Sequence, residues 1–258
     1  QMLMDTKPQY FSDLVRIAGL AHGTDVWLGN AQTLIKEGKA TISTAICTRD
    51  DIMIYLIQKG LDSEESFKIM EMVRKGKVAS GKCKEWPEWK QDMIDHGVPD
   101  WYIWSCERIK YMFPKAHAAA YVMMAWRVAY CKVFYPLAYY TAYFSIRATA
   151  FDYEKMAMSP VRLEHYIAEY KAKKAEGTIS NTEEDELGVM RIVQEMHARG
   201  YEFTPIDIYK AKARTFQIID GKIMPSFKVI SKVGEVAGES IEIAARDGEF
   251  LSKDDLRQ

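Results

Sequence analysis

The sequence predicts a mainly α-helical protein with a small α+β region near its C-terminus, and two features carry that prediction. Over the first two thirds of the 258 residues, apolar side chains recur every three or four positions, which is the spacing of one helix face. Near the C-terminus, the alternating segment 214–227 is interrupted by Asp220-Gly221, a typical signal for a type I′ β-hairpin. We therefore expect a helical region followed by one hairpin at residues 215–224.

Helices in the first half are expected to begin at polar capping residues, which are Ser12 or Asp13, Ser43 or Thr48, and Asp62 or Ser63. Gly60 is expected to end the second of these helices, because glycine adopts the left-handed conformation of many helix ends. The helical pattern lapses over residues 75–87, where glycines and lysines predict an exposed loop, and residues 75–85 are expected to be mobile when no partner is bound. Helices resume at residues 88–96 and 100–112.

Pro114 is expected to start the strongest helix of the chain, because its missing N–H is one that the first turn does not use. Residues 229–245 predict a short helix pair around Gly234, which would form a helix-hairpin-helix-like element. We place a domain boundary after residue 200, giving domains of residues 1–200 and 201–258. The remaining helices are expected at residues 115–134, 136–145, 164–176 and 182–199.

Composition excludes several classes of protein. The 35 basic and 36 acidic side chains give a net charge of −1, so the whole chain is not a basic nucleic-acid-binding protein, although charges can segregate by segment. The four cysteines lie far apart in the sequence, which argues against structural zinc and a disulfide framework and favours a cytoplasmic location. The N-terminus lacks the pattern of a signal peptide, and charges interrupt the longest apolar stretch, so we expect no membrane association.

Familiar catalytic motifs are absent from the sequence: there is no phosphate-binding loop of the GxxxxGK[ST] type, no GxGxxG, no HExxH and no GxSxG. Asp50-Asp51 is the one tempting carboxylate pair. Adjacent helical residues point about 100° apart, so we expect the pair to serve as helix cap and first-turn acid rather than as a two-metal site. We expect no metal ligands in these 258 residues.

A basic run without acidic residues spans positions 72–84 and contains Arg74, Lys75, Lys77, Lys82 and Lys84. Such a density of cations suits the neutralisation of nucleic-acid phosphates. A solvated loop kept soluble by its lysines explains the same run equally well, so the sequence leaves both interpretations open.

The segment KYMFPKAHAAAY (residues 110–121) has the composition of an anion-binding helix end. Free amides and the side chains of Lys115 and His117 would face a triphosphate, because a helix N-terminus carries unpaired N–H groups and partial positive charge. Tyr121 follows His117 by four residues and would offer a ring for base stacking on the same face. The alternative is a core histidine beside a buried tyrosine, which local spacing alone slightly favours.

A third candidate is SKVGEVAGESI (residues 231–241), in which a glycine turn between helices would aim backbone amides at a phosphate. An ordinary corner between two helices is the simpler interpretation of its spacing.

The sequence resembles the PolC-type alpha subunit of bacterial DNA polymerase III. Four blocks carry the resemblance in order: RIAGLAHGTDVWLGNAQ (16–32), CTRDDIMIYLI (47–57), FKIMEMVRKGK (67–77) and IKYMFPKAHAAAYVMMAWRVAYCKVFYPLAYY (109–140). The likeness continues through YEFTPIDIY (201–209) and GEFLSKDDL (248–256). It implies a fingers domain followed by the start of the duplex-binding region with its helix-hairpin-helix element.

The resemblance also implies roles for individual residues. Lys115 and His117 match fingers residues near the incoming triphosphate, Tyr121 matches the residue that packs on the nascent base pair, and Arg74, Lys75 and Lys77 match the segment that faces nucleotide and template. Residues 78–89 are longer and more basic and aromatic than the acidic helix usual in the family. Ser231-Lys232-Val233-Gly234 replaces the family's usual Pro-Gly-hydrophobic-Gly hairpin, so phosphate binding there is either weakened or supplied in part by Lys232. The resemblance implies DNA contacts for Lys232 and Gly234, and also for Lys82 and Lys84.

The function implied is template-directed DNA synthesis by a parent nucleotidyltransferase, in which this piece binds incoming dNTP and template-primer DNA. The family's palm aspartates, which hold the two Mg²⁺ ions, do not occur in these residues, so the piece alone is expected to be inactive. Contacts with the sliding clamp are expected through the parent chain. The competing interpretation is a standalone helical nucleic-acid-binding or interaction module.

Overall fold

The computed structural model describes residues 1–248, 250 and 252, and the chain divides into two compact units, Gln1–Arg127 and Val128–Gln258. The division falls inside the helix α8 (Lys115–Phe134), and each unit is described here by itself. The functional boundary expected after residue 200 is a different division and stays a prediction. The block GEFLSKDDL lies mostly outside the described residues.

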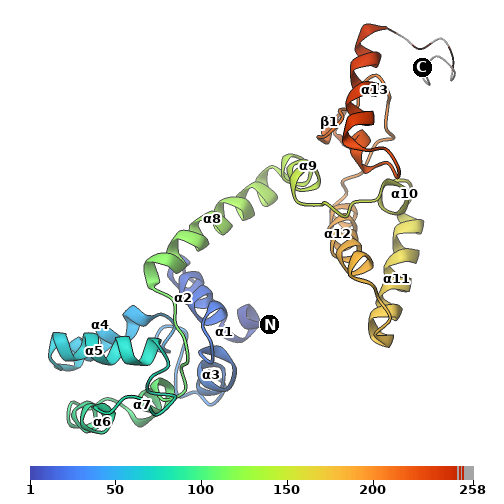
Figure 1. The fold of residues 1–258 in the computed structure, drawn as a ribbon. Helices are drawn as coiled ribbons and strands as arrows, with labels where there is room; N and C mark the ends of the chain where they lie inside the picture. The colour runs from blue at the N-terminus through green and yellow to red at the C-terminus, as the bar shows by residue number, and fades with distance from the viewer. Residues whose placement is uncertain (249, 251, 253–258) are drawn as a thin grey trace. The chain divides into compact units, whose positions relative to one another are not determined.

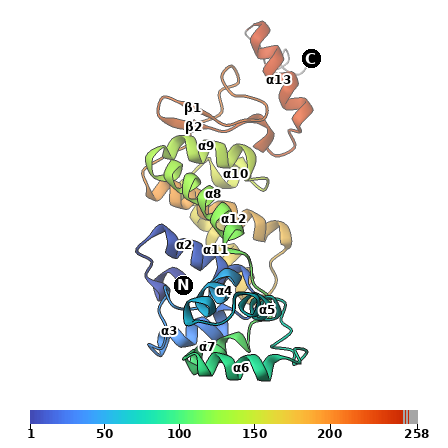
Figure 2. The ribbon, with the colours of Figure 1, turned by 90° about the vertical axis from the view of Figure 1, so that its left-hand side faces the viewer.

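The first unit is helical throughout, in agreement with the expected fold class. Its helices α4 and α5 pack against each other, while α2 and the start of α8 lie at the other end of the unit from α6 and α7 (Figures 1 and 2). Its elements are α1 (Met2–Thr6), α2 (Phe11–His22), an irregular turn (Trp27–Ala31), α3 (Gln32–Lys36), α4 (Arg49–Lys59), α5 (Ser63–Arg74), α6 (Trp86–Asp95), α7 (Asp100–Cys106) and α8.

Some of the predicted helix ends are confirmed and others are wrong. Helix α2 begins at Phe11, so Asp13 lies in its first turn and does not precede it, and α7 ends at Cys106 and not at residue 112. Asp62 caps α5 by accepting hydrogen bonds from the amides of Glu64 and Glu65 at 2.9 and 3.0 Å. Thr48 precedes α4, and its amide donates to Asp51 Oδ2 at 2.8 Å in a capping box. Gly60 ends α4 at φ 99°, a conformation that favours glycine.

The core of the first unit forms where α4, α5, α6 and α7 meet. Ile52, Leu56, Ile69 and Met93 are completely or almost completely excluded from solvent in this cluster. A polar pair joins α7 to the irregular turn, because Ser105 Oγ donates to Asn30 Oδ1 at 2.6 Å. Both groups are buried, and each satisfies the other's hydrogen-bonding capacity.

The segment between α5 and α6 is irregular, as expected, but it is not wholly exposed. Val78 and Cys83 are buried in the core of the first unit and anchor the segment at two points. Gly76 has φ 68° and lies so close to Lys110 that a Cβ there would be 2.5 Å from the Lys110 carbonyl oxygen. The exposed loop predicted over residues 75–87 is therefore corrected: it has an apolar underside, and helix α6 begins within it, at Trp86.

The second unit packs helices beside one small hairpin. Helices α11 and α12 contact each other along their lengths, and α9 contacts both strands (Figure 1). Tyr140, Phe144, Phe151 and Phe216 lie at the centre of its aromatic core. The elements are α9 (Pro136–Ile146), α10 (Tyr153–Met156), α11 (Pro160–Glu176), α12 (Asn181–Ala198), β1 (Gln217–Ile219), β2 (Lys222–Met224), a 3₁₀ turn (Phe227–Val229) and α13 (Glu235–Asp247).

The β-hairpin is confirmed in position and turn type. Strands β1 and β2 pair antiparallel with Ile219 opposite Lys222, and Asp220 and Gly221 both have positive φ, at 50° and 76°. The helix pair expected over residues 229–245 is only half correct. A single 3₁₀ turn replaces its first helix, because Ser231 to Val233 continue in a turn with Lys232 at φ 68°, and α13 alone follows Gly234.

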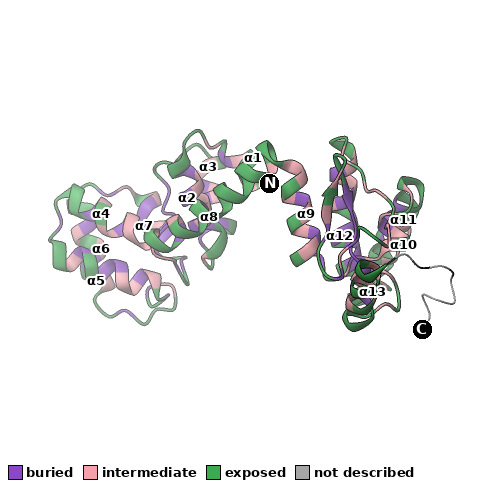
Figure 3. Ribbon diagram, turned by 90° about the horizontal axis from the view of Figure 1, so that it is seen from above, coloured by how far each residue is buried: buried purple, intermediate pink, exposed green. Residues whose placement is uncertain are grey.

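Helix α8 is unusual in its exposure. Of its 20 residues, Ala118 and Val122 are the buried ones, and Figure 3 shows most of the helix in the colours of exposed and intermediate residues. In the described part of the chain, no helix combines the length and the apolar character that crossing a membrane requires.

Candidate functional site

The N-terminus of α8 already holds an internal carboxylate. The Lys115 amide donates to Asp50 Oδ2 at 2.6 Å, and the Pro114 carbonyl accepts the Ala118 amide at 3.1 Å. The expectation that the Lys115 amide is free for an outside anion is therefore wrong, because the side chain of Asp50 reaches it from α4. Anion binding at this end depends on side chains and on the amides that follow.

The Asp50-Asp51 pair has the structural role expected of it. Asp51 Oδ2 accepts from the amides of Cys47 and Thr48, at 3.1 and 2.8 Å, and Asp50 Oδ2 accepts from Lys115. Both carboxylates are thus used in holding α4 and α8. Among the described residues, no three His, Cys, Asp or Glu side chains are grouped closely enough to hold a metal ion.

Four aromatic side chains form a continuous row at the start of α8, and we call this row the aromatic ladder: Tyr111, Phe113, His117 and Tyr121. Successive ring centroids lie 5.4, 4.9 and 4.6 Å apart, and His117 is stacked on Phe113 with 19° between the planes. Tyr121 is 62% exposed and His117 is exposed as well. The core histidine beside a buried tyrosine is therefore excluded, and flat apolar rings face solvent instead.

A shallow hollow of about 220 Å³ lies beside the ladder. Its walls are Phe113, His117 and Tyr121 from the ladder, together with residues of α2 and the small Ala118. His22 contacts the edge of Phe113 at 5.7 Å and extends the aromatic surface onto α2. Small residues on one side and rings on the other leave room for a flat apolar group.

Lys115 does not share that hollow. Its side chain lines a second hollow of about 310 Å³ with Arg16, Ser43, Thr44 and Asp51, and the two hollows have no lining residue in common. The structure thus brings His117 and Tyr121 together as the sequence predicts, whereas Lys115 faces a different space. The first turn of α8 separates a cationic hollow from an aromatic one.

Arg74 and Lys75 at the end of α5 are held by one carboxylate. Glu71 accepts hydrogen bonds from Arg74 through both carboxylate oxygens, and Lys75 Nζ lies 2.8 Å from Glu71 Oε2. Arg49 approaches the same group at 3.8 Å. The hydrogen bonds from Arg74, and after it from Lys75, lower the pKa of Glu71 to about 2. The predicted basic run is therefore partly neutralised at its start.

Arg74 is also joined to the ladder through the backbone. The Met112 amide donates to the Arg74 carbonyl at 3.3 Å, so the cationic end of α5 lies directly beside the segment that carries Tyr111 and Phe113. The positively charged side chains and the aromatic rings thus adjoin in one unit, although some 40 residues separate them in the sequence.

Unlike Arg74 and Lys75, the lysines of the loop between α5 and α6 have no carboxylate partner among the described residues. Lys77, Lys82 and Lys84 are exposed, and within the described residues none of them forms an ion pair. Lys232 and Gly234 belong to the second unit, where Lys232 is exposed and Gly234 precedes α13. The structure leaves their proposed contact with DNA as a prediction.

Sequence reasoning missed Tyr111, Phe113, His22, Arg49 and Glu71. A signal for Phe113 was present, because it precedes His117 by four residues and Tyr121 by eight, so the helical spacing extends back across Pro114. Nothing local marks Arg49 or Glu71, since their meeting depends on the packing of α4 against α5.

Comparison with known proteins places the sequence beside bacterial DNA polymerases. Residues 1–97 match the family described as the bacterial DNA polymerase III alpha subunit finger domain. The whole chain is 50% identical over 257 residues to the PolC-type DNA polymerase III of Streptococcus suis and 48% identical over 258 residues to that of Bacillus subtilis. It is also 50% identical over 259 residues to the PolC-type enzyme of Bacillus cereus.

Each alignment covers 100% of this chain but only 17–18% of the relative. The class defined at the N-terminal end is thus a polymerase finger domain. Over its whole length the chain resembles a part of the PolC-type DNA polymerase III enzymes.

Proposed function

We propose that this chain is the part of a replicative DNA polymerase that binds the incoming dNTP and the template-primer DNA during template-directed synthesis. The observation that carries the proposal is the exposed aromatic ladder beside the cationic end of α5. A nucleotide needs both a flat apolar contact for its base and cations for its phosphates, and the first unit holds both.

The ladder supplies the contact for the base. Tyr121 is 62% exposed and lies next to His117, and stacking on an aromatic ring tolerates all four bases because each base has a π-face. A polymerase needs this tolerance, since selection among bases comes from pairing with the template. The ladder is therefore suited to the nascent base pair.

The cations supply the contacts for phosphates. Arg74, Lys75 and Lys115 are assigned to the triphosphate, with Glu71 orienting the first two. The loop lysines and Lys232 with Gly234 are assigned to the DNA backbone. Sliding-clamp contacts and the two Mg²⁺ ions are assigned to the remainder of a polymerase of the relatives' length, so the chain by itself binds without incorporating nucleotides.

Salt-dependent DNA binding tests the assignment of the loop. Replacing Lys77, Lys82 and Lys84 together with Gln should weaken binding of a primer-template duplex and reduce the slope of log K against log salt by about 2–3, because each lost phosphate contact removes roughly 0.7–0.9. Fluorescence anisotropy at several salt concentrations measures both quantities.

A matched control replaces three exposed lysines of the same unit that lie outside the loop, Lys7, Lys36 and Lys59. This variant carries the same net charge and should keep the slope of the unaltered chain. Equal slopes for the two triple variants would contradict the assignment, because they would show that net charge rather than the loop controls binding.

A further inference from the structure

The hollow lined by Lys115 has a distinct composition. Arg16 from α2 and Lys115 from α8 both line it, with Ser43 and Thr44 from the loop before α4. Its volume of about 310 Å³ exceeds what a phosphate group occupies. The hollow is thus large enough for a phosphate group and is lined by two cations.

The two cations lack carboxylate partners. Arg16 Nη1 donates to the Ile42 carbonyl at 3.1 Å, and within the described residues neither Arg16 nor Lys115 forms an ion pair. Asp51 is the carboxylate that lines the hollow, and its Oδ2 already accepts from two backbone amides. The hollow therefore carries a surplus of positive charge, with donors that are unused.

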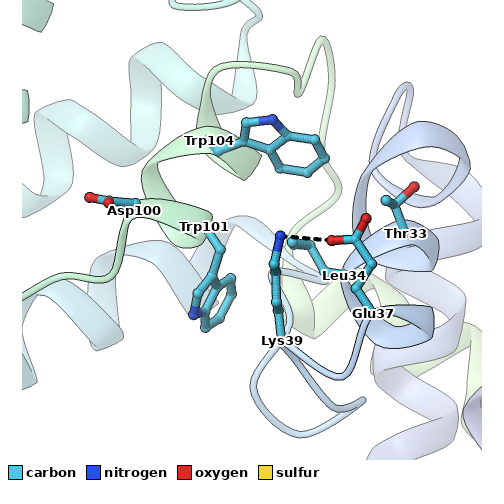
Figure 4. Close-up of a pocket in the computed structure, with 7 residues that line it drawn as sticks. All are labelled: Thr33, Leu34, Glu37, Lys39, Asp100, Trp101 and Trp104. Atoms are coloured by element: carbon cyan, nitrogen blue, oxygen red, sulfur yellow. Dashed lines mark ion pairs between the residues drawn. The ribbon is translucent and has the colours of Figure 1, made fainter.

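A neighbouring hollow shows the contrast. The space of about 610 Å³ between α3 and α7 is lined by Trp101, Trp104 and Lys39, and there the ammonium group of Lys39 pairs with Glu37 at 2.8 Å (Figure 4). Trp101 lines both hollows. The lysine of the tryptophan hollow is neutralised by its own chain, whereas Lys115 and Arg16 are not.

We propose that the second hollow is a phosphate-binding site in which Arg16 acts beside Lys115 and the Ser43 hydroxyl donates a hydrogen bond. A guanidinium offers several N–H donors in one plane and binds phosphate oxygens in pairs, which an ammonium group alone does not. The proposal rests on the proposed function, because both assign Lys115 to the binding of a phosphate group. It adds Arg16 and Ser43, and it separates this phosphate from the aromatic ladder.

The phosphate belongs either to a nucleotide's triphosphate or to the DNA backbone, and the chemistry of recognition is the same. Isothermal titration of the 258-residue chain with inorganic tripolyphosphate, and separately with a single-stranded oligonucleotide lacking terminal phosphates, distinguishes the two sources. Arg16→Gln should weaken binding of one of these probes roughly 10-fold, as expected for loss of a charge-assisted contact. Arg16→Lys should recover part of that loss.

A second variant avoids the Arg16–Ile42 hydrogen bond, whose loss can disturb folding. Ser43→Asp places a negative charge in the hollow from an exposed loop position and should weaken the same probe at least as much, whereas Ser43→Asn should have a small effect. Lys36→Gln, an exposed lysine outside the hollow, is the control for net charge. Melting temperatures confirm that each variant is folded.

The outcomes separate this proposal from the proposed function. If Arg16→Gln and Ser43→Asp leave both probes bound as before, the hollow is not a phosphate site; a loss on Lys115→Gln in that case still supports the role of Lys115. If the two substitutions weaken tripolyphosphate binding while ladder and loop variants leave DNA and nucleotide binding unchanged, the hollow is supported and the proposed function fails. An unaltered chain that binds neither probe overturns the proposal outright.

Discussion

The carboxylate of Glu71 holds the cationic side chains at the end of α5 in place. Its side chain is only 18% exposed and accepts from Arg74 and Lys75, with Arg49 at 3.8 Å. A carboxylate that is shared in this way orients the donors and reduces their free charge. Glu71 therefore joins cationic side chains from α4 and from the end of α5, and its substitution tests how much this contact stabilises the first unit.

We expect Glu71→Gln to lower the free energy of unfolding of the first unit by about 1–2 kcal/mol at pH 7, because the charge-assisted hydrogen bonds to Arg74 weaken. The folded-state pKa of Glu71 lies at about 2, below its usual value. Its contribution is therefore complete above the usual value and disappears as the pH falls through about 2. The difference between the two proteins should shrink over that range.

Urea unfolding followed by tryptophan fluorescence measures this effect in the right unit, because all six tryptophans lie within residues 1–127. Glu64→Gln is the control, since Glu64 is 76% exposed and pairs with Lys68 alone. Its effect should stay within about 0.5 kcal/mol. A cost for Glu71→Gln that is the same at pH 7 and pH 3 would contradict the account.

At the scale of elements, the glycine in the hairpin turn and the glycine inside α12 differ in backbone conformation. Gly221 has φ 76° in the turn between β1 and β2, where a Cβ is strained although space is open. Gly188 lies inside α12, and a Cβ there would contact nothing within 4 Å. The same substitution should therefore have opposite effects at the two positions.

Gly221→Ala should destabilise the second unit by about 1 kcal/mol, and Gly188→Ala should stabilise it by up to about 1 kcal/mol. The first forces a side chain into a left-handed conformation, and the second removes the flexibility of glycine from a helix interior. Thermal unfolding followed by circular dichroism at 222 nm measures both, because this unit contains no tryptophan. Shifts of the same sign would contradict the account.

The elements that could be predicted from sequence are those set by neighbouring residues. The cap at Asp62, the stop at Gly60 and the Asp220-Gly221 turn each depend on fewer than five consecutive positions. Contacts between distant segments were missed: Asp50 reaches the Lys115 amide across 65 positions, and the packing of α4 on α5 brings Arg49 to Glu71. No local sequence pattern predicts a contact between residues that lie so far apart in the chain.

The candidate site shows the same limit. Its residue types were predicted, and the contact between His117 and Tyr121 follows from four-residue spacing on α8, whereas their exposure does not, because spacing alone slightly favours a buried pair. The separation of Lys115 from that pair was not predicted, because Arg16 and Ser43 approach the helix from other segments. The prediction of a helix pair around Gly234 was wrong in its first helix for a local reason, because Lys232 adopts φ 68° and cannot continue a helix.

At the scale of the whole molecule, this chain accounts for less than a fifth of the length of its relatives. The proposed function makes Tyr121 the contact for the nascent base pair. Because Tyr121 is 62% exposed, its truncation should leave the melting temperature of the chain almost unchanged. A loss of activity would then report binding and not folding.

The most direct test measures kcat/KM for dNTP incorporation by a PolC-type polymerase that contains this chain, with Tyr121→Ala and Tyr121→Phe. Loss of stacking should lower kcat/KM for Tyr121→Ala roughly 10- to 100-fold for all four dNTPs, corresponding to about 1.4–2.7 kcal/mol. Tyr121→Phe should stay within about 2-fold, because stacking requires the ring and not the hydroxyl. A folded Tyr121→Ala enzyme with unchanged kcat/KM for every dNTP would contradict the central claim.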